Sequence, residues 1–242
     1  MSLSKDQTYV DQLMSEVEGF GIALEERQAV LMLRHLDLVL EKNKDLNLTR
    51  ITEPPAAVRL HDLDSILLAP YLTPEDRFLD VGTGAGFPGV PLAIASGAKG
   101  TLLDSLHKRM DAVSVFVREL GLDGQLEVVA ERAENFAKQR RGEYDVVVAR
   151  AVAQVGVLLE YATPFLSTDG RVVISKGDPS DEELAIGEDV AQLCGLENVS
   201  RETLELPEGS GQRTILVYKR VADPTIRLPR KPGMATKRPL GR

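Results

Sequence analysis

The chain has 242 residues, of which 43% are hydrophobic and 27% are charged, and this is ordinary usage for a globular protein. The length allows one sizeable core, or one core with a small helical appendage. Cys194 is the only cysteine, which excludes an internal disulfide and a cysteine-rich zinc site and indicates a reducing compartment. No apolar run is long enough to cross a bilayer, and residues 1–6 lack the features of a signal peptide. We expect a cytoplasmic protein with no metal site and no membrane partner.

The formal net charge of −8 hides an uneven distribution of charge along the chain. Residues 219–242 hold eight basic side chains and one acidic one, a balance of +7, whereas the rest of the chain carries −15. This asymmetry indicates contact with a polyanion at one end of an acidic body. A solvated tail that keeps the protein soluble is the alternative. Residues 221–242 are also rich in proline, so we expect a basic C-terminal tail that is mobile without a partner.

The first 72 residues show only helical patterns. Apolar residues at helical spacing predict two helices within residues 9–43, broken near Gly19 and Gly21. Pro54 and Pro55 interrupt the pattern, and a further helix is predicted over residues 56–70. We interpret residues 1–72 as an N-terminal helical cap rather than an independent domain.

From Arg77 onward, short β-rich runs alternate with helical segments. We expect strands at 77–81, 100–104, 126–130, 144–149 and 171–175, and helices at 88–96, 106–120, 131–138 and 153–166. Such alternation predicts a parallel sheet covered on both faces. A turn-rich joint at 207–211 predicts an antiparallel hairpin of residues 200–206 and 213–219. The predicted fold is therefore α/β, with a doubly wound, mostly parallel, seven-stranded sheet over residues 73–220.

A glycine-rich loop follows the first predicted strand, which ends at Asp80 and Val81. Glycine is needed where the backbone turns sharply or a ligand approaches closely, and the loop holds Gly82, Gly84, Gly86 and Gly89. Residues 84–89 satisfy the G-x-G-x-x-G pattern and Asp104 lies 20 residues after Gly84, so a nicotinamide-dependent oxidoreductase is one interpretation. Against it, the Asp80 carboxylate would repel a pyrophosphate but could receive the ammonium or sulfonium of S-adenosylmethionine. We favour S-adenosylmethionine as the cofactor.

Acidic residues after the second and third predicted strands complete this site. Asp104, followed by Ser105, ends the second strand, from which a carboxylate can accept both ribose hydroxyls. Asp104 could also cap the next helix, and the two roles can coexist. After the third strand, Ala133 and Glu134 are candidates for the edge of an adenine pocket, although an exposed helical glutamate is the common alternative.

The ordered set of motifs resembles the RsmG family, also called GidB, which are guanine-N7 methyltransferases of small-subunit ribosomal RNA with the class I S-adenosylmethionine-dependent methyltransferase fold. The resemblance runs from the helical cap to the tail and rests on residues 47–49, 61–65, 80–89, 103–105, 108–109, 132–134, 149–151, 175–177 and 228–233. It implies cofactor contacts at Gly82, Phe87, Ala133, Glu134 and Arg150, with Asp104 as the ribose carboxylate. Asn135 departs from the pattern, because many members carry a second acidic residue there.

The resemblance also implies a substrate, namely 16S ribosomal RNA, free or within a small ribosomal subunit precursor, methylated at N7 of guanine 527 in the usual numbering. We expect a monomer. Guanine N7 has an available lone pair, so orientation suffices and no general base is assigned. Arg150 and Phe87 are candidates for reading the base. His61 and Asp64 either face the RNA or the reaction centre, or anchor the cap to the sheet. A small-molecule methyltransferase stays an alternative function.

Overall fold

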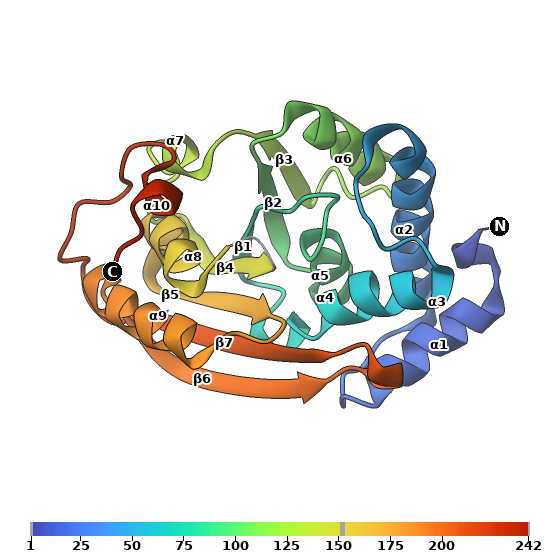
Figure 1. The fold of residues 1–242 in the computed structure, drawn as a ribbon. Coiled ribbons are helices and arrows are strands. Elements are labelled where there is room, and N and C mark those ends of the chain that lie inside the picture. The colour runs from blue at the N-terminus through green and yellow to red at the C-terminus, as the bar shows by residue number, and fades with distance from the viewer. Residues whose placement is uncertain (1, 151–152, 242) are drawn as a thin grey trace.

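A computed structural model describes residues 2–150 and 153–241. Over these residues the chain forms a seven-stranded sheet in the order β3-β2-β1-β4-β5-β7-β6, with helices on both faces (Figure 1). The strands are β1 (Arg77–Val81), β2 (Lys99–Asp104), β3 (Leu126–Ala130), β4 (Tyr144–Arg150), β5 (Leu166–Lys176), β6 (Leu196–Glu205) and β7 (Gln212–Arg220). The predicted doubly wound fold is confirmed.

Strands β1 to β5 run parallel, and β7 pairs antiparallel with both β5 and β6. The hairpin predicted at residues 207–211 is present, and its second strand is inserted between β5 and β6. From β1 to β3 each new strand is added on one side of β1, and from β4 onward the strands are added on its other side. The carboxyl ends of β1 and β4 therefore flank the switch point, where ligands bind in open α/β sheets.

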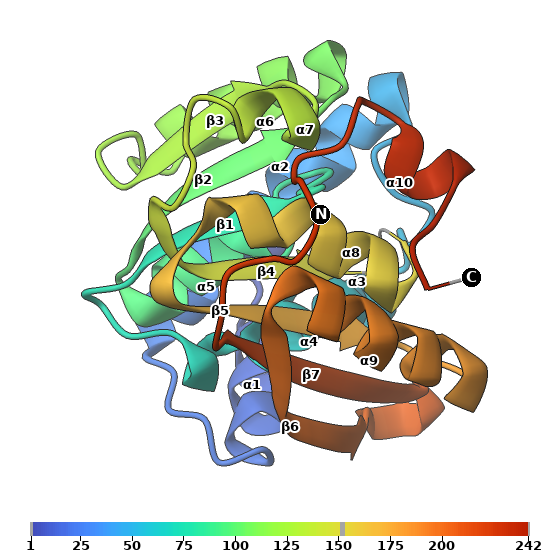
Figure 2. The same cartoon turned by 90° about the vertical axis from the view of Figure 1, so that its left-hand side faces the viewer.

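Helices cover the two faces of the sheet in two groups (Figures 1 and 2). One face carries α1 (Gln7–Glu18), α2 (Glu26–Leu46), α5 (Gly89–Ser96) and α6 (His107–Glu119), and the other carries α7 (Ala133–Phe136), α8 (Val155–Ala162) and α9 (Asp181–Cys194). Helices α1 and α2 share one apolar cluster with α5 and α6, so the N-terminal cap is packed into the main core. None of the described helices is long and apolar enough to cross a membrane.

The third helical segment of the cap is less regular than the pattern predicts. It begins as α3 (Pro54–Ala57), continues as a π-helical stretch (Val58–Leu63) and ends as α4 (Asp64–Ile66). Proline fits the first helical position because it has no N–H to leave unpaired there. Wide π turns occur often at functional sites, and this one faces the carboxyl end of β4.

Two helices differ from the sequence expectation. The helix predicted at 131–138 is shortened to the four residues of α7, and α9 was not predicted. A signal for α9 is present, since the Ser180 side chain accepts a hydrogen bond from the Glu183 N–H at 3.1 Å, as an N-cap residue does.

Part of the basic tail is packed against the body, so the expectation that residues 221–242 contribute little to the core is wrong for Leu228 and Ala235. The side chain of Leu228 is 5% exposed and that of Ala235 is 1% exposed. Arg230 pairs with Glu160 of α8, and the chain then forms α10 (Met234–Lys237). The buried carboxylate of Glu160 on α8 holds the tail in place, and no local pattern identifies this partner.

The turn after β7 rests on the end of α9, and this contact can be tested at Gly195. Gly195 has φ +71°, and an added Cβ would lie 2.3 Å from the Ala222 carbonyl oxygen. Gly121 has φ +69° with no atom within 4 Å of the same position. We expect Gly121→Ala to lower the free energy of unfolding by about 1–2 kcal/mol through strain alone. Gly195→Ala should cost about 1–3 kcal/mol more from the clash. Urea unfolding of both variants measures the difference, and equal losses would contradict the contact.

Candidate functional site

A cavity of about 400 Å³ lies outside the carboxyl ends of the parallel strands. Its walls come from residues at or just after the ends of β1, β2, β3 and β4, with further residues from α8 and α10. Six of the ten predicted cofactor-binding residues line it, namely Gly82, Asp104, Ser105, Ala133, Glu134 and Arg150. The fold therefore brings together, at the switch point, residues that are up to 68 positions apart in the sequence.

Asp104 holds the glycine loop and the start of the next helix together. Its Oδ2 accepts a hydrogen bond from the Gly84 N–H at 3.2 Å, and its Oδ1 accepts one from the Leu106 N–H at 3.0 Å. Arg109 lies one turn further on, with its Nη1 3.5 Å from Oδ2. The N-cap of α6 is Leu106, and no side chain caps this helix, so the N-cap role considered for Asp104 is wrong. The side chain is still 11% exposed, toward the cavity.

Glu134 is buried, although the sequence allowed an ordinary exposed glutamate. It is 5% exposed, and its Oε1 accepts a hydrogen bond from the Gly233 N–H at 2.6 Å. A buried carboxylate needs such donors, because the cost of removing it from water is offset only by hydrogen bonds or charge. The exposed alternative is therefore wrong.

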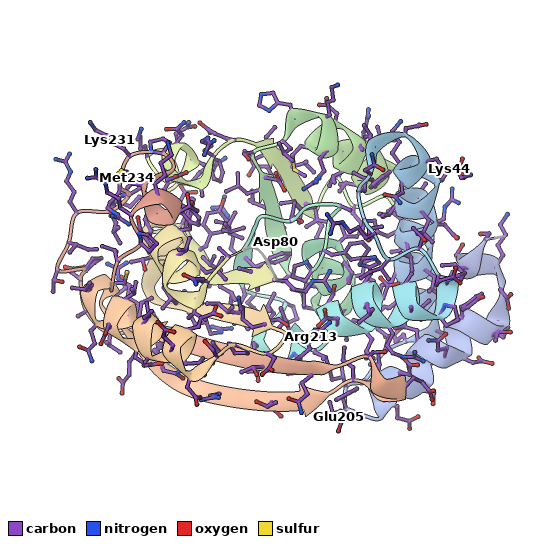
Figure 3. The ribbon with its side chains drawn as sticks, viewed as in Figure 1. Lys44, Asp80, Glu205, Arg213, Lys231 and Met234 are labelled. Carbon is purple, nitrogen blue, oxygen red and sulfur yellow. The ribbon has the colours of Figure 1, made fainter. Side chains whose placement is uncertain are left out.

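Asp80 lies beneath the glycine loop, in the interior of the molecule (Figure 3). Its Oδ2 accepts a hydrogen bond from the Gly89 N–H at 2.8 Å, and a Cβ on Gly89 would lie only 2.2 Å from Leu102 Cδ2. Burial raises the pKa of Asp80 to about 7. Asp80 does not line the cavity. The hydrogen bond from Gly89 shows that Asp80 shapes the glycine loop. A contact between Asp80 and a positive charge of the cofactor stays a prediction.

The remaining loop residues pack against the helical cap. Gly86 has φ +99°, and a Cβ there would approach His35 Nε2 to 2.9 Å. The Phe87 ring is 6% exposed and lies between His35 and His61, with ring centroids 4.6 and 4.8 Å away. Burial lowers the pKa of His35 to about 3 and that of His61 to about 4, so both rings are neutral at pH 7. Phe87 is thus covered by the two rings, and its roles in contacting the cofactor or reading the base stay predictions.

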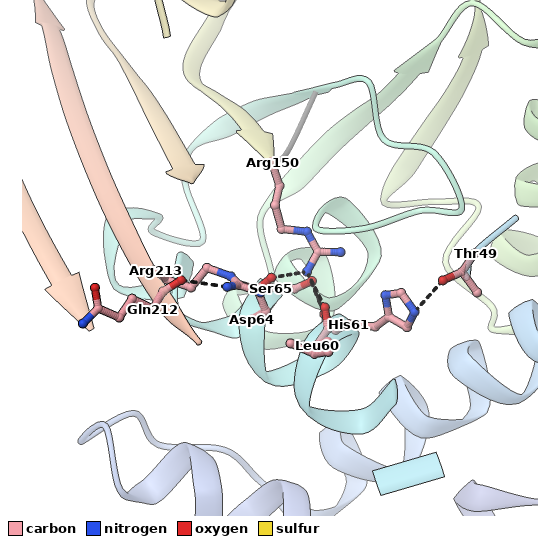
Figure 4. Close-up of polar contacts among 8 residues, drawn as sticks. All are labelled: Thr49, Leu60, His61, Asp64, Ser65, Arg150, Gln212 and Arg213. Atoms are coloured by element: carbon pink, nitrogen blue, oxygen red, sulfur yellow. Dashed lines mark hydrogen bonds and ion pairs between the residues drawn. The ribbon is translucent and has the colours of Figure 1, made fainter. Parts of the chain in front are cut away.

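Arg150, at the end of β4, is held by the cap in a polar cluster (Figure 4). Its Nη1 donates to Asp64 Oδ2 at 3.1 Å and to the carbonyl oxygens of Leu60 and His61 at 3.2 Å each. Arg213 Nε of β7 donates to Asp64 Oδ1 at 2.8 Å. His61 and Asp64 are both buried, so they anchor the cap to the sheet as one alternative proposed. The Asp64 carboxylate is thus shared between two guanidiniums, of which only that of Arg150 reaches the cavity.

Other residues of the cavity wall were not predicted. Among them are Arg109, Glu131, Arg132, Ala153, Tyr161 and Thr236. Arg109, Glu131 and Arg132 stand beside predicted site residues in the sequence, and proximity could have suggested them. Tyr161 and Thr236 reach the cavity only through packing of α8 and α10, which no local pattern reports. Ala151, which belongs to the motif around Arg150, lies outside the described residues.

Comparison with solved structures defines the class of the fold. The chain superposes on a geranyl diphosphate methyltransferase solved with GPP and sinefungin, with a TM-score of 0.56, 15% identity, and coverage of 70% of this chain and 84% of that one. It also superposes on Pyrococcus horikoshii TYW2 solved with MeSAdo, with a TM-score of 0.55, 11% identity, and coverage of 72% and 66%. At such identities the likeness concerns the fold, which is that of the class I methyltransferases.

Sequence comparison defines the family. The family model GidB, described as rRNA small subunit methyltransferase G, matches residues 28–215. The ribosomal RNA small subunit methyltransferase G of Carboxydothermus hydrogenoformans is 40% identical over 225 residues, covering 91% of this chain and 95% of that protein. The protein of the same name from Alkaliphilus oremlandii is 38% identical over 235 residues, covering 95% and 98%. The chain belongs to the GidB family, as the motifs of its sequence indicated.

The raised pKa of Asp80 predicts how stability depends on pH. The unfolded carboxyl loses its proton near pH 4, whereas the folded one keeps it until about pH 7. The contribution of Asp80 to the free energy of unfolding therefore falls as pH rises between these values, by up to about 1.4 kcal/mol per pH unit. Asp80→Asn keeps an acceptor for the Gly89 N–H and does not titrate. In urea unfolding between pH 5 and 8, the free energy of unfolding of the wild type should fall relative to that of Asp80→Asn until about pH 7. If the two proteins show the same dependence of this free energy on pH, the raised pKa of Asp80 is contradicted.

Proposed function

We propose that this protein acts as a cytoplasmic monomer that transfers a methyl group from S-adenosylmethionine to N7 of guanine 527 in 16S ribosomal RNA, free or within a small-subunit precursor. The observation that carries the proposal is the cavity at the switch point, lined by Asp104 and Glu134, in a chain that matches the family over residues 28–215. The relatives are named as methyltransferases of small-subunit ribosomal RNA.

The cavity residues fit an adenosine group. Asp104 ends β2 with its carboxylate partly exposed to the cavity, where it can accept the two ribose hydroxyls. Ala133 and Glu134 follow β3 on the adjoining wall, where Glu134 can accept from the adenine amino group. Gly82 leaves room for close approach of the ligand to the backbone. The bound cofactor supplies the methyl group as a sulfonium, and the protein supplies orientation.

Methyl transfer to guanine N7 requires alignment rather than proton removal, because the N7 lone pair is free. The sequence at the end of β4 agrees, since it holds Ala149 and Arg150 and lacks the polar-Pro-Pro-aromatic turn with which amino-group methyltransferases hold an exocyclic nitrogen. Arg150 is fixed in place by Asp64, so its remaining guanidinium donors are available to a base edge or a phosphate. We infer that Arg150 positions the substrate.

The exposed cations near the cavity support an RNA substrate over a small molecule. Lys231 precedes α10 and Lys237 is its last residue; both are exposed, and Thr236 of the same helix lines the cavity. These charges offset the acidic body, which would otherwise repel phosphates. A nicotinamide-dependent oxidoreductase is the weaker alternative, because only the glycine pattern and the spacing to Asp104 support it, whereas the family match supports methyl transfer.

The role of Asp104 can be tested with S-adenosylhomocysteine, which shares its adenosine group with the cofactor. Asp104→Ala should weaken binding by roughly 10- to 150-fold, because it removes hydrogen bonds to a charged acceptor that contribute about 1.5–3 kcal/mol. Asp111→Ala, which removes an exposed acid from α6, is the matched control and should bind as wild type does. Titration calorimetry measures both, and an unchanged affinity for Asp104→Ala would remove this residue from the site.

The reaction itself is tested in cells with and without the gene. Base-resolved mapping of N7-methylguanine in 16S ribosomal RNA should show one modified guanine that disappears on deletion. Wild type should restore the modification, whereas Asp104→Ala should restore much less. An identical modification pattern in both strains would overturn the proposed substrate.

A further inference from the structure

The segment of residues 228–236, called here the C-terminal strap, crosses the outside of α8 and reaches the cavity (Figure 2). Two anchors fix its first part. Leu228 is buried, and its carbonyl oxygen accepts a hydrogen bond from Arg141. Arg230 forms a bidentate pair with Glu160 of α8, with Nε 2.7 Å from Oε1 and Nη2 2.5 Å from Oε2. Bidentate Arg–carboxylate pairs are among the stronger polar contacts, and the Glu160 side chain is only 4% exposed.

The second part of the strap contacts the predicted adenine wall directly. The Gly233 N–H donates to Glu134 Oε1 at 2.6 Å, and Gly233 adopts φ +78°, which turns the chain into α10. Ala235 is 1% exposed against the body, while Thr236 lines the cavity together with Glu134 and Tyr161. The family model ends at residue 215, so the strap lies outside the matched range.

We propose that the C-terminal strap is part of the cofactor site, with Thr236 contacting the adenosine group and Gly233 orienting Glu134. The ligand class follows from the neighbours, because Glu134 stands on the wall after β3 and Asp104 on the wall after β2, the positions assigned above to adenine and ribose. This inference rests on the proposed function. It replaces the view of the tail as a segment that contacts RNA alone.

Gly233 has a positioning role in this arrangement. A carboxylate has two acceptor oxygens, and the backbone N–H engages Oε1 of Glu134. That bond fixes the plane of the carboxylate and leaves Oε2 to accept the exocyclic amino group of adenine. Without the strap, the Glu134 carboxylate would be more hydrated and free to rotate, so it would select adenine less well.

The test introduces a bulky side chain at the wall of the cavity. Thr236 is solvent-accessible and lies on a four-residue helix, so Thr236→Trp should fold while filling space that the adenosine group needs. We expect at least a tenfold loss of affinity for S-adenosylhomocysteine in titration calorimetry. Arg238→Trp places the same side chain two residues later, at an exposed position that does not line the cavity. This control should bind within about threefold of wild type.

Hydrogen exchange provides a second measurement on the unmodified protein. Saturation with S-adenosylhomocysteine should slow amide exchange in residues 229–236 at least threefold, and leave the distant turn 207–211 unchanged. If wild type binds the ligand while Thr236→Trp binds equally well and exchange in the strap is unaltered, the strap proposal is overturned and the proposed function stands. If wild type binds no S-adenosylhomocysteine, the proposed function fails and the strap proposal fails with it.

Discussion

The carboxylate of Asp64 is the contact on which the arrangement of the site depends. It lies in the helical cap and accepts from Arg150 of β4 and Arg213 of β7, so it joins three segments that are distant in the sequence. Burying the charged Asp64 and Arg150 side chains is costly. This cost is offset by the pairing of their charges and by the two backbone carbonyl oxygens that accept hydrogen bonds from Arg150. Loss of the carboxylate would leave two guanidiniums facing each other. The cap and the carboxyl edge of the sheet are therefore held together by charge as well as by apolar packing.

The glycine loop is shaped by two carboxylates at the ends of adjacent strands. Asp80 of β1 accepts the Gly89 N–H, and Asp104 of β2 accepts the Gly84 N–H. On the outer side, Phe87 is enclosed by two neutral histidines of the cap. The loop is thus formed before a ligand arrives, which reduces the ordering cost of binding. Burial gives the two acids different roles, because Asp80 is enclosed while Asp104 keeps one side toward the cavity.

The sequence predicted the sheet well because alternating β-rich and helical runs are local signals, and β1 and β3 begin and end where expected. The ends of parallel strands indicated Asp104 and Glu134 as site residues, whereas Arg150 was implied only by the family resemblance, and all three line one cavity. The sequence could not predict that Phe87 is covered by His35 and His61, since that contact depends on how the cap packs. The mobile tail was predicted from composition, and the buried pair between Arg230 and Glu160, 70 residues apart, overrides composition.

The walls of the cavity come from residues as far apart as Gly82 and Thr236, and from both faces of the sheet. A ligand that touches all of them loses its contacts when any one of these segments detaches. The binding free energy of such a ligand is therefore added to the free energy of unfolding of the whole molecule, and not only to the free energy of local unfolding of one segment. At a free ligand concentration 100 times Kd this addition is about 2.7 kcal/mol. Occupancy of the cavity would consequently raise the resistance of the whole chain to heat and to proteolysis.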